Sequence, residues 1–124
     1  SIEYLSLLRR IRDICVNNAI PFTSMGESKE ADTVITVVGQ QISVHFYEKS
    51  TNLRTLLSRI LPTIGKGISI VLFKNLTDKD SFQQLMNSSP SVAPLILKME
   101  ADSSSLLFLT TEELEKLLLE FKSM

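Results

Sequence analysis

Cysteine and histidine are nearly absent from this sequence of 124 residues, which contains one of each. Because Cys15 has no second cysteine to pair with, no internal disulfide bond can form, and a lone thiol is typical of a reducing compartment such as the cytosol or nucleus. His45 is likewise alone, which excludes a histidine pair, a zinc cluster and a Cys–His catalytic arrangement. We expect Cys15 on the buried face of a helix and His45 on the exposed face of a strand.

Long hydrophobic runs and an excess of charge of one sign are also lacking. No apolar run approaches the roughly 18 residues of a membrane-spanning helix. The net charge of −1 argues against a protein that coats nucleic acid, although a local basic face can still contact phosphates. With 44% hydrophobic and 22% charged residues, the composition is that of a globular protein with one core. We expect a single domain over residues 1–124, and a first residue other than methionine is compatible with a domain cut from a longer protein.

Helical and strand periodicities alternate along the chain. Tyr4, Ile11 and Cys15 recur at helical spacing, whereas Ile42–Tyr47 alternates apolar and polar side chains as a half-buried strand does. Ile68–Phe73 is apolar without alternation, which is typical of a central strand covered on both faces. The predicted strands are 33–38, 42–47, 68–73, 95–99 and 106–109, and the predicted helices are 4–18, 53–61, 77–86 and 114–121. The candidate helix caps are Thr51 or Asn52, the pair Thr77–Asp80 and the pair Thr110–Glu113.

The order of these elements is α-β-β-α-β-α-β-β-α. Gly39-Gln40 predicts a tight turn between the first two strands. Strand–helix–strand connections require parallel neighbours, so the strands at 42–47, 68–73 and 95–99 should be at least partly parallel. We therefore predict a three-layer α/β/α domain, in which a mixed sheet has helices on both faces and the first and last helices pack near each other.

Residues at the strand ends are the candidates for chemistry, because function in open α/β sheets collects there. A metal-dependent nuclease of this shape holds magnesium with an aspartate at the hairpin and with an acidic residue two positions before a lysine. Asp32 is placed to be the first ligand, but the strand face reads His45, Tyr47 and Lys49. Glu48 is adjacent to Lys49, so strand alternation sends the two side chains to opposite faces. The sequence predicts no catalytic residue and no metal site, and the alternative is a divergent nuclease that uses Asp32, Glu48 and Lys49.

Other motifs of small-molecule chemistry are missing. No nucleophile-elbow motif accompanies the serines. Gly65-Lys66-Gly67 precedes a strand, whereas the glycine loops that bind phosphate precede helices. We expect no cofactor and no small-molecule substrate.

Basic side chains are the candidates for contact with nucleic acid. Three arginines fall mostly off the apolar stripe of the first helix and can form a phosphate-contacting stripe, although a solvated helix face is the favoured explanation. The aromatic residues needed to stack single-stranded bases are not interleaved with them. Leu119 adds apolar surface outside the stripe of the last helix, which suggests a protein partner. The candidate residues for the backbone of duplex DNA are Arg9, Arg10, Arg12, Lys49, Arg54 and Lys74.

Several segments resemble a known superfamily. Asp32–Val37 followed by Ile42–Lys49 resembles the hairpin of the restriction-endonuclease-like superfamily. Gly67–Thr77 resembles the apolar strand and the Asn-Leu-Thr helix start of the N-terminal jaw domain of the fifth common subunit of eukaryotic RNA polymerases. Leu106–Leu114 resembles the final strand and turn of the same domain, and the endonucleases show a similar strand followed by Glu-Glu-Leu.

The resemblance implies a nuclease-derived fold without nuclease activity, serving inside a nucleic-acid machine. We therefore expect a non-catalytic module of a larger nucleic-acid-handling assembly, such as a transcription complex. Its partners would be protein subunits, with secondary contacts to the backbone of duplex DNA, in the nucleus or cytoplasm. A divergent metal-dependent nuclease and a pure protein–protein interaction domain are the two alternatives.

Overall fold

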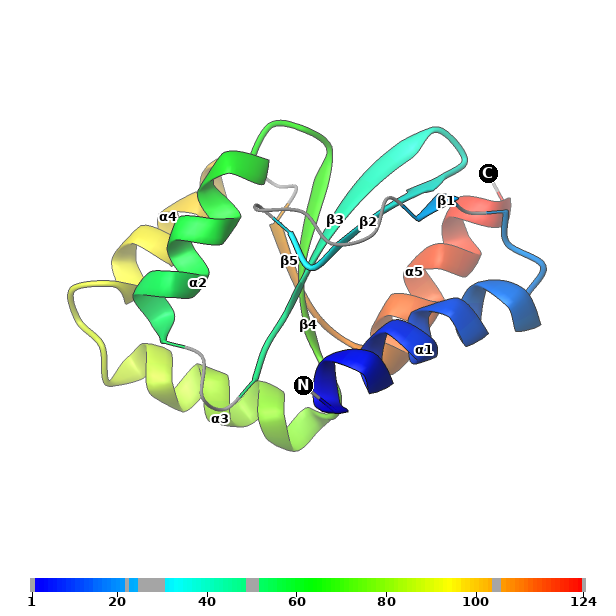
Figure 1. The fold of residues 1–124 in the computed structure, drawn as a ribbon. Helices are drawn as coiled ribbons and strands as arrows, with labels where there is room; N and C mark the ends of the chain where they lie inside the picture. The colour runs from blue at the N-terminus through cyan, green and yellow to red at the C-terminus, as the bar shows by residue number, and fades with distance from the viewer. Residues whose placement is uncertain (1, 22, 25–30, 49–51, 104–105, 124) are drawn as a thin grey trace.

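The computed structural model of the chain describes residues 2–21, 23–24, 31–48, 52–103 and 106–123 (Figure 1). The elements in chain order are α1 (Ile2–Asn17), β1 (Thr23–Ser24), β2 (Thr33–Val37), β3 (Gln40–Phe46), α2 (Leu53–Ile60), the 3-10 helix η1 (Leu61–Thr63), β4 (Ile68–Phe73), α3 (Leu76–Asn87), α4 (Ala93–Ser103), β5 (Leu106–Thr110) and α5 (Thr111–Ser123). In the described part of the chain, no helix has the length and apolar character to cross a membrane.

The five strands form one mixed sheet in the order β1-β2-β3-β4-β5. β2 pairs antiparallel with β1 and with β3, whereas β3–β4 and β4–β5 are parallel pairs. Each parallel pair is connected by helices, because a parallel neighbour can be reached only by a crossover to the other end of the sheet. The predicted α/β class, the hairpin and the parallel pairing of 42–47 with 68–73 are confirmed. The hairpin turn lies at Val38-Gly39, one residue earlier than predicted, and both residues have positive φ, 50° and 79°.

The predicted strand at 95–99 is wrong, since these residues belong to α4. Ile96 is fully buried, but Leu95 and Leu97 are 52% and 55% exposed, as expected for one side of a helix on a core. A short apolar run without alternation does not distinguish a buried strand from a helix, which explains the error. The predicted element order is therefore also wrong: two consecutive helices, α3 and α4, connect β4 to β5.

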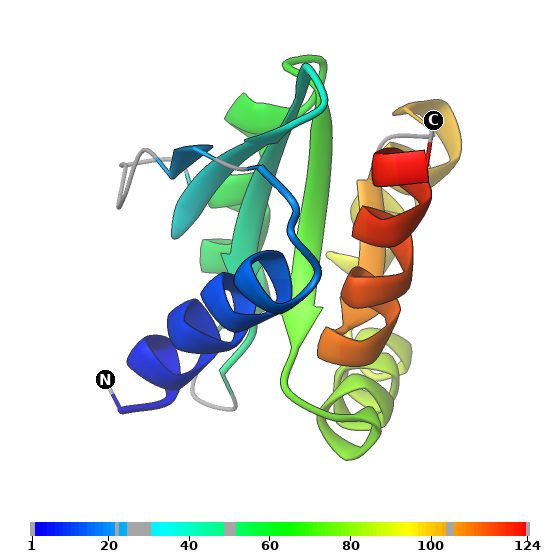
Figure 2. The same ribbon diagram turned by 90° about the vertical axis from the view of Figure 1, so that its right-hand side faces the viewer.

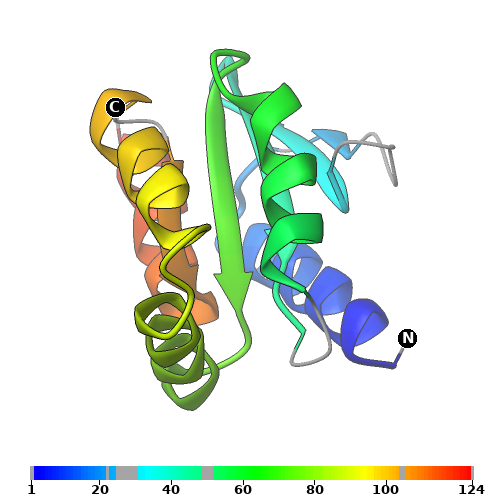
Figure 3. The ribbon, with the colours of Figure 1, turned by 90° about the vertical axis from the view of Figure 1, so that its left-hand side faces the viewer.

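Helices cover both faces of the sheet and enclose two hydrophobic clusters (Figures 2 and 3). On one face, α1 and α5 pack against β2, β3 and β4, and this cluster contains Cys15, buried as predicted. On the other face, α2, α3 and α4 pack against β4 and β5. The first and last helices are neighbours as expected, because Asn18 Nδ2 donates to Glu115 Oε2 at 3.3 Å and Lys122 Nζ donates to the Asn18 carbonyl at 2.6 Å.

Because helices cover both faces of the sheet, the environment of β3 differs from the predicted one. The strand was predicted to be half-buried, but its polar residues Ser43 and His45 are only 3% and 1% exposed. The alternation of apolar and polar side chains therefore does not mark a solvent face here. The second helical layer buries the polar side, so those side chains need internal hydrogen-bond partners.

Side-chain caps set where three helices begin. Asn52 Oδ1 accepts from the Arg54 amide at 2.7 Å, as one of the two predicted caps. The N-cap of α3 is Asn75, whose Oδ1 accepts from the Asp78 amide at 2.9 Å, so the predicted Thr77–Asp80 box is wrong. Asn75 caps α3 in place of Thr77 because its extended backbone follows β4 directly, and asparagine is a strong N-cap. The Thr110–Glu113 box is confirmed by reciprocal bonds of 3.3 and 3.0 Å.

Candidate functional site

The carboxyl ends of the three parallel strands meet at one edge of the sheet. β3, β4 and β5 are followed there by Tyr47, Lys74 and Thr111. Because β2 is antiparallel to β3, its first residues lie at the same edge, and Asp32 precedes β2. Ligand sites of open α/β sheets are formed at this edge, so it is the candidate site of this protein.

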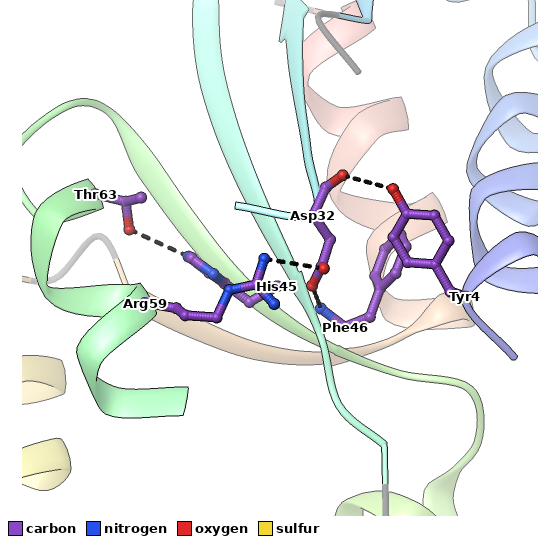
Figure 4. Close-up of polar contacts among 6 residues, drawn as sticks. All are labelled: Tyr4, Asp32, His45, Phe46, Arg59 and Thr63. Carbon is purple, nitrogen blue, oxygen red and sulfur yellow. Dashed lines mark hydrogen bonds and ion pairs between the residues drawn. The ribbon is translucent and has the colours of Figure 1, made fainter. Parts of the chain in front are cut away.

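Asp32 is 7% exposed, and protein groups surround its carboxylate (Figure 4). Oδ2 accepts from the backbone amide of Phe46 at 2.7 Å, and Oδ1 forms an ion pair with Arg59 at 3.1 Å. The Asp32 amide donates to the Val44 carbonyl at 3.0 Å, and its own carbonyl accepts from the Tyr4 hydroxyl at 3.1 Å. One residue thus joins the start of β2 to the end of β3, to α1 and to α2.

These contacts do not fit the metal ligand that the nuclease alternative requires. Both carboxylate oxygens of Asp32 already have cationic or N–H partners. Tyr47, on the strand face where the acid should stand, is buried with its ring 5.2 Å from Phe73 and 5.3 Å from Phe82, measured between centroids. Glu48 is half-buried beyond β3, and Lys49 lies outside the described residues. Within the described ranges, no three His, Cys, Asp or Glu side chains are grouped so that they could hold a metal ion.

His45 lies in a buried polar chain, not on the exposed face where it was expected. Its Nε2 is 3.2 Å from Thr63 Oγ1 (Figure 4). That hydroxyl oxygen is also 2.9 Å from Ser69 Oγ. The single hydroxyl proton of Thr63 is donated to the Ile60 carbonyl at 2.7 Å. Thr63 Oγ1 must therefore accept from His45, which places the imidazole proton on Nε2 and leaves Nδ1 as an acceptor.

Nδ1 of His45 has no hydrogen-bond partner among the described residues. Burial and, secondarily, the positive charge of Arg59 lower the pKa of His45 from 6.5 to about 4. A neutral imidazole with this tautomer matches the hydroxyl chain, whereas an imidazolium would be desolvated beside a guanidinium. His45 is therefore held neutral near pH 7.

A second group of polar residues surrounds a pocket of about 360 Å³ where α3 and α5 begin. Two ion pairs lie at this end of the sheet: Lys79 Nζ is 3.0 Å from Glu113 Oε1, and Lys74 Nζ is 3.6 Å from Asp78 Oδ2. A hydrogen bond from the Thr110 amide is the main cause that lowers the pKa of Glu113. The pocket is lined by Arg10, Lys74, Asn75, Leu76, Lys79, Thr110, Thr111, Glu112 and Glu113.

The pocket brings together two of the six basic residues predicted to contact nucleic acid, Arg10 and Lys74. Arg9 and Arg12 are exposed on α1, but at 3.6 residues per turn Arg12 lies about 160° around the helix from Arg10, so the three arginines do not form one stripe. Arg54 lines a separate hollow of about 530 Å³ between the start of α2 and the end of α3. Lys49 is outside the described residues.

The sequence analysis did not predict the partners of two charged residues at this edge. The sequence did not predict that Arg59 pairs with Asp32, yet its guanidinium lies 3.1 Å from that carboxylate. Arg59 directly precedes Ile60, which is fully buried. A charged side chain so close to the core usually needs a counter-charge, and this position is the sequence signal for the ion pair. Lys79, four residues after the cap Asn75, had no local signal for its pairing with Glu113, because 34 residues separate the two.

The sequence matches no family model, and neither the curated proteins nor the solved structures compared with it gave a match.

Proposed function

We propose that this chain is a non-catalytic module with a nuclease-type α/β fold, which docks within a larger nucleic-acid-handling assembly such as a transcription complex. The observation that carries the proposal is the state of Asp32, whose carboxylate is bound by Arg59 and by the Phe46 amide. In a nuclease of this shape, that aspartate would face a divalent ion. Here Asp32 joins the start of β2 to β3, α1 and α2, which supports a structural role for this residue instead of a catalytic one.

The resemblance to the restriction-endonuclease-like superfamily, and to the jaw domain of the polymerase subunit, is part of this proposal. It is supported by the mixed sheet with an N-terminal hairpin and by helices on both faces. Exposed apolar side chains support a protein partner: Leu119, 39% exposed on α5, and Leu5 and Val16, each 63% exposed on α1.

Secondary contacts to phosphate are best placed at the pocket between α3 and α5. Arg10 of α1 meets Lys74 and Lys79, which lie just before and inside α3, at this pocket. Glu112 and Glu113 line the same pocket, so its net charge is small and the contribution to affinity is correspondingly modest. Such contacts fit a module whose main attachment is to protein.

The direct test is the binding of a fluorescein-labelled duplex DNA, followed by fluorescence anisotropy over a series of salt concentrations in EDTA. The logarithm of the affinity should fall with the logarithm of salt, by about 0.9 per phosphate contact. The double variant Arg10→Ala/Lys74→Ala should lower this slope by about 2. The matched control Arg9→Ala/Arg12→Ala removes the same charge from α1 outside the pocket and should lower it less.

Three outcomes contradict parts of the proposal. Undetectable binding at the lowest salt removes the phosphate contacts and leaves a pure protein-interaction domain. Equal losses in the two double variants show that the pocket has no special role. Cleavage of DNA that requires Mg²⁺ or Mn²⁺ and is lost in Asp32→Asn would establish the divergent nuclease and overturn the non-catalytic assignment.

A further inference from the structure

The connection between α3 and α4 contains a serine directly followed by a proline, Ser89-Pro90. Of the four prolines in the sequence, only Pro90 follows a serine or a threonine. Residues 88–92 belong to no helix or strand, and Ser89 is partly buried between the exposed residues Ser88 and Pro90. Ser89 therefore lies near the surface, in the kind of connecting segment where local opening costs least.

The hydroxyl of Ser89 differs from that of the preceding serine in its hydrogen bonding. Ser88 Oγ donates to the Leu85 carbonyl at 3.0 Å. Within the described ranges, no hydrogen bond engages the hydroxyl of Ser89. Its oxygen can therefore react without first breaking a bond inside the protein.

The backbone around Ser89 favours a negative charge at this position. The Ser89 carbonyl accepts from the amides of Val92 at 3.2 Å and Ala93 at 3.0 Å, so Ser89 caps the helical turn that leads into α4. Pro90 occupies the first position of that turn, where its missing N–H costs nothing. The start of a helical turn carries a partial positive charge, which stabilises an anionic group on the capping residue.

Arg54 supplies a full positive charge to the same place. It lines the hollow of about 530 Å³ together with Ser89, because the start of α2 lies beside the α3–α4 connection (Figure 1). The side chain of Arg54 is exposed, and no ion pair engages it in the described part of the chain. Its planar guanidinium is suited to bind a phosphate with two parallel hydrogen bonds.

We propose that Ser89 is a phosphorylation site for a proline-directed protein kinase, and that the phosphate pairs with Arg54. Kinases of this class select a serine followed by proline, because proline has no N–H to be left unpaired in the kinase subsite after the serine. Ser89 Oγ attacks the γ-phosphorus of MgATP, so that an O–P bond forms while the anhydride bond between the β- and γ-phosphates breaks. ADP leaves, and an aspartate of the kinase accepts the hydroxyl proton.

The modification would join two elements that the unmodified chain leaves separate. A phosphoserine carries a charge of about −1.5 to −2 near pH 7 and three acceptor oxygens. Bound to Arg54, it ties the α3–α4 connection to the start of α2. This proposal is independent of the proposed function.

The first test treats the folded chain with a purified mitogen-activated protein kinase and MgATP, followed by mass spectrometry of the intact protein and of its peptides. We expect one phosphoryl group per chain, at Ser89. Ser89→Ala should abolish the modification, and Pro90→Ala, which keeps the hydroxyl, should slow it by roughly tenfold or more. The matched control Ser91→Ala removes an exposed hydroxyl from the same connection and should leave the rate unchanged.

The second test measures the pairing with Arg54 by phosphorus NMR of the modified protein during a pH titration. Beside a guanidinium, the second pKa of the phosphate should lie below its ordinary value of about 6. Arg54→Ala should raise that pKa without changing the rate of phosphorylation. The control Arg12→Ala removes an exposed cation from α1, on the other face of the sheet, and should leave the pKa low.

Three results overturn the proposal. The first is a folded chain that the kinase leaves unmodified or modifies at other residues. The second is a synthetic peptide covering 84–97 that is phosphorylated while the folded chain is not, since the fold would then withhold the hydroxyl. The third is a phosphate pKa that Arg54→Ala and Arg12→Ala change equally, which would remove the pairing.

Discussion

The carboxylate of Asp32 and the guanidinium of Arg59 form an ion pair of 3.1 Å between the start of the hairpin and the last turn of α2. The second carboxylate oxygen accepts from the Phe46 amide at 2.7 Å, so the pair also fixes the end of β3. Together the two contacts give each carboxylate oxygen of Asp32 a partner within the protein.

Asp32→Ala should lower the free energy of unfolding by about 2–4 kcal/mol, because it leaves the Phe46 amide and Arg59 without their partner. Arg59→Ala should cost less, about 1–2 kcal/mol, since the Phe46 bond survives and Arg59 is partly exposed. Urea denaturation followed by circular dichroism measures both. Arg54→Ala, on the exposed side of the same helix, is the control and should change stability by less than about 0.5 kcal/mol. A loss for Asp32→Ala no larger than for Arg54→Ala would contradict the scaffold role.

The buried His45 should make the protein lose stability in mild acid. Its pKa is about 4 in the folded state, against an ordinary value of 6.5 for a solvated histidine, so between these values the unfolded chain binds the proton more readily. The stabilisation that depends on neutral His45 is fully present above about pH 6.5 and is lost as the pH falls to about 4. The total loss in the free energy of unfolding is about 3 kcal/mol at most. His45→Gln, whose amide can donate to Thr63 in place of Nε2, should flatten this part of the profile. Parallel pH profiles for the two proteins would contradict the prediction.

Val38→Asn should stabilise the hairpin. Val38 is β-branched, 58% exposed and held at φ 50°, in the left-handed region that branched residues adopt at a cost. Asn-Gly is the preferred pair for a two-residue turn with positive φ at both positions, so a gain of about 1 kcal/mol is expected. Thermal and urea unfolding measure it. Gly39→Ala, at φ 79° with open space around its Cα, should instead destabilise, which separates backbone strain from packing.

Glu113→Gln should weaken the start of α5 and change its response to acid. The pKa of Glu113 is lowered chiefly by the hydrogen bond from the Thr110 amide, so its stabilisation is present above its unfolded pKa and disappears as the pH falls through the folded value. Because Glu113 is partly exposed, Glu113→Gln should lower the free energy of unfolding near pH 7 by only about 0.5–1 kcal/mol. Glu112→Gln, exposed in the same turn, is the control for a general loss of negative charge at the helix start. Equal effects of the two changes would contradict the capping role.

Local patterns predicted most of the secondary structure. The hairpin, the central strand at 68–73 and the cap pair Thr110–Glu113 depend on residues close together in sequence, so their periodicity and spacing were sufficient. Ile96 and its apolar neighbours form a helix, because a run of three apolar residues fits either structure and packing against α2, α3 and β5 decides. The local sequence also did not identify Asn75 as the cap of α3, because that role depends on where β4 ends.

The sequence by itself determined an α/β class, a buried cysteine and the absence of an internal disulfide, because these depend on composition and short-range periodicity. Only the tertiary structure decided what Asp32 and His45 do. Their partners, Arg59 and Thr63, are distant in sequence, and both pairings arise because α2 and η1 cover the polar side of β3. Once that side is buried, a carboxylate and an imidazole must find partners within the protein, and no local pattern records which ones.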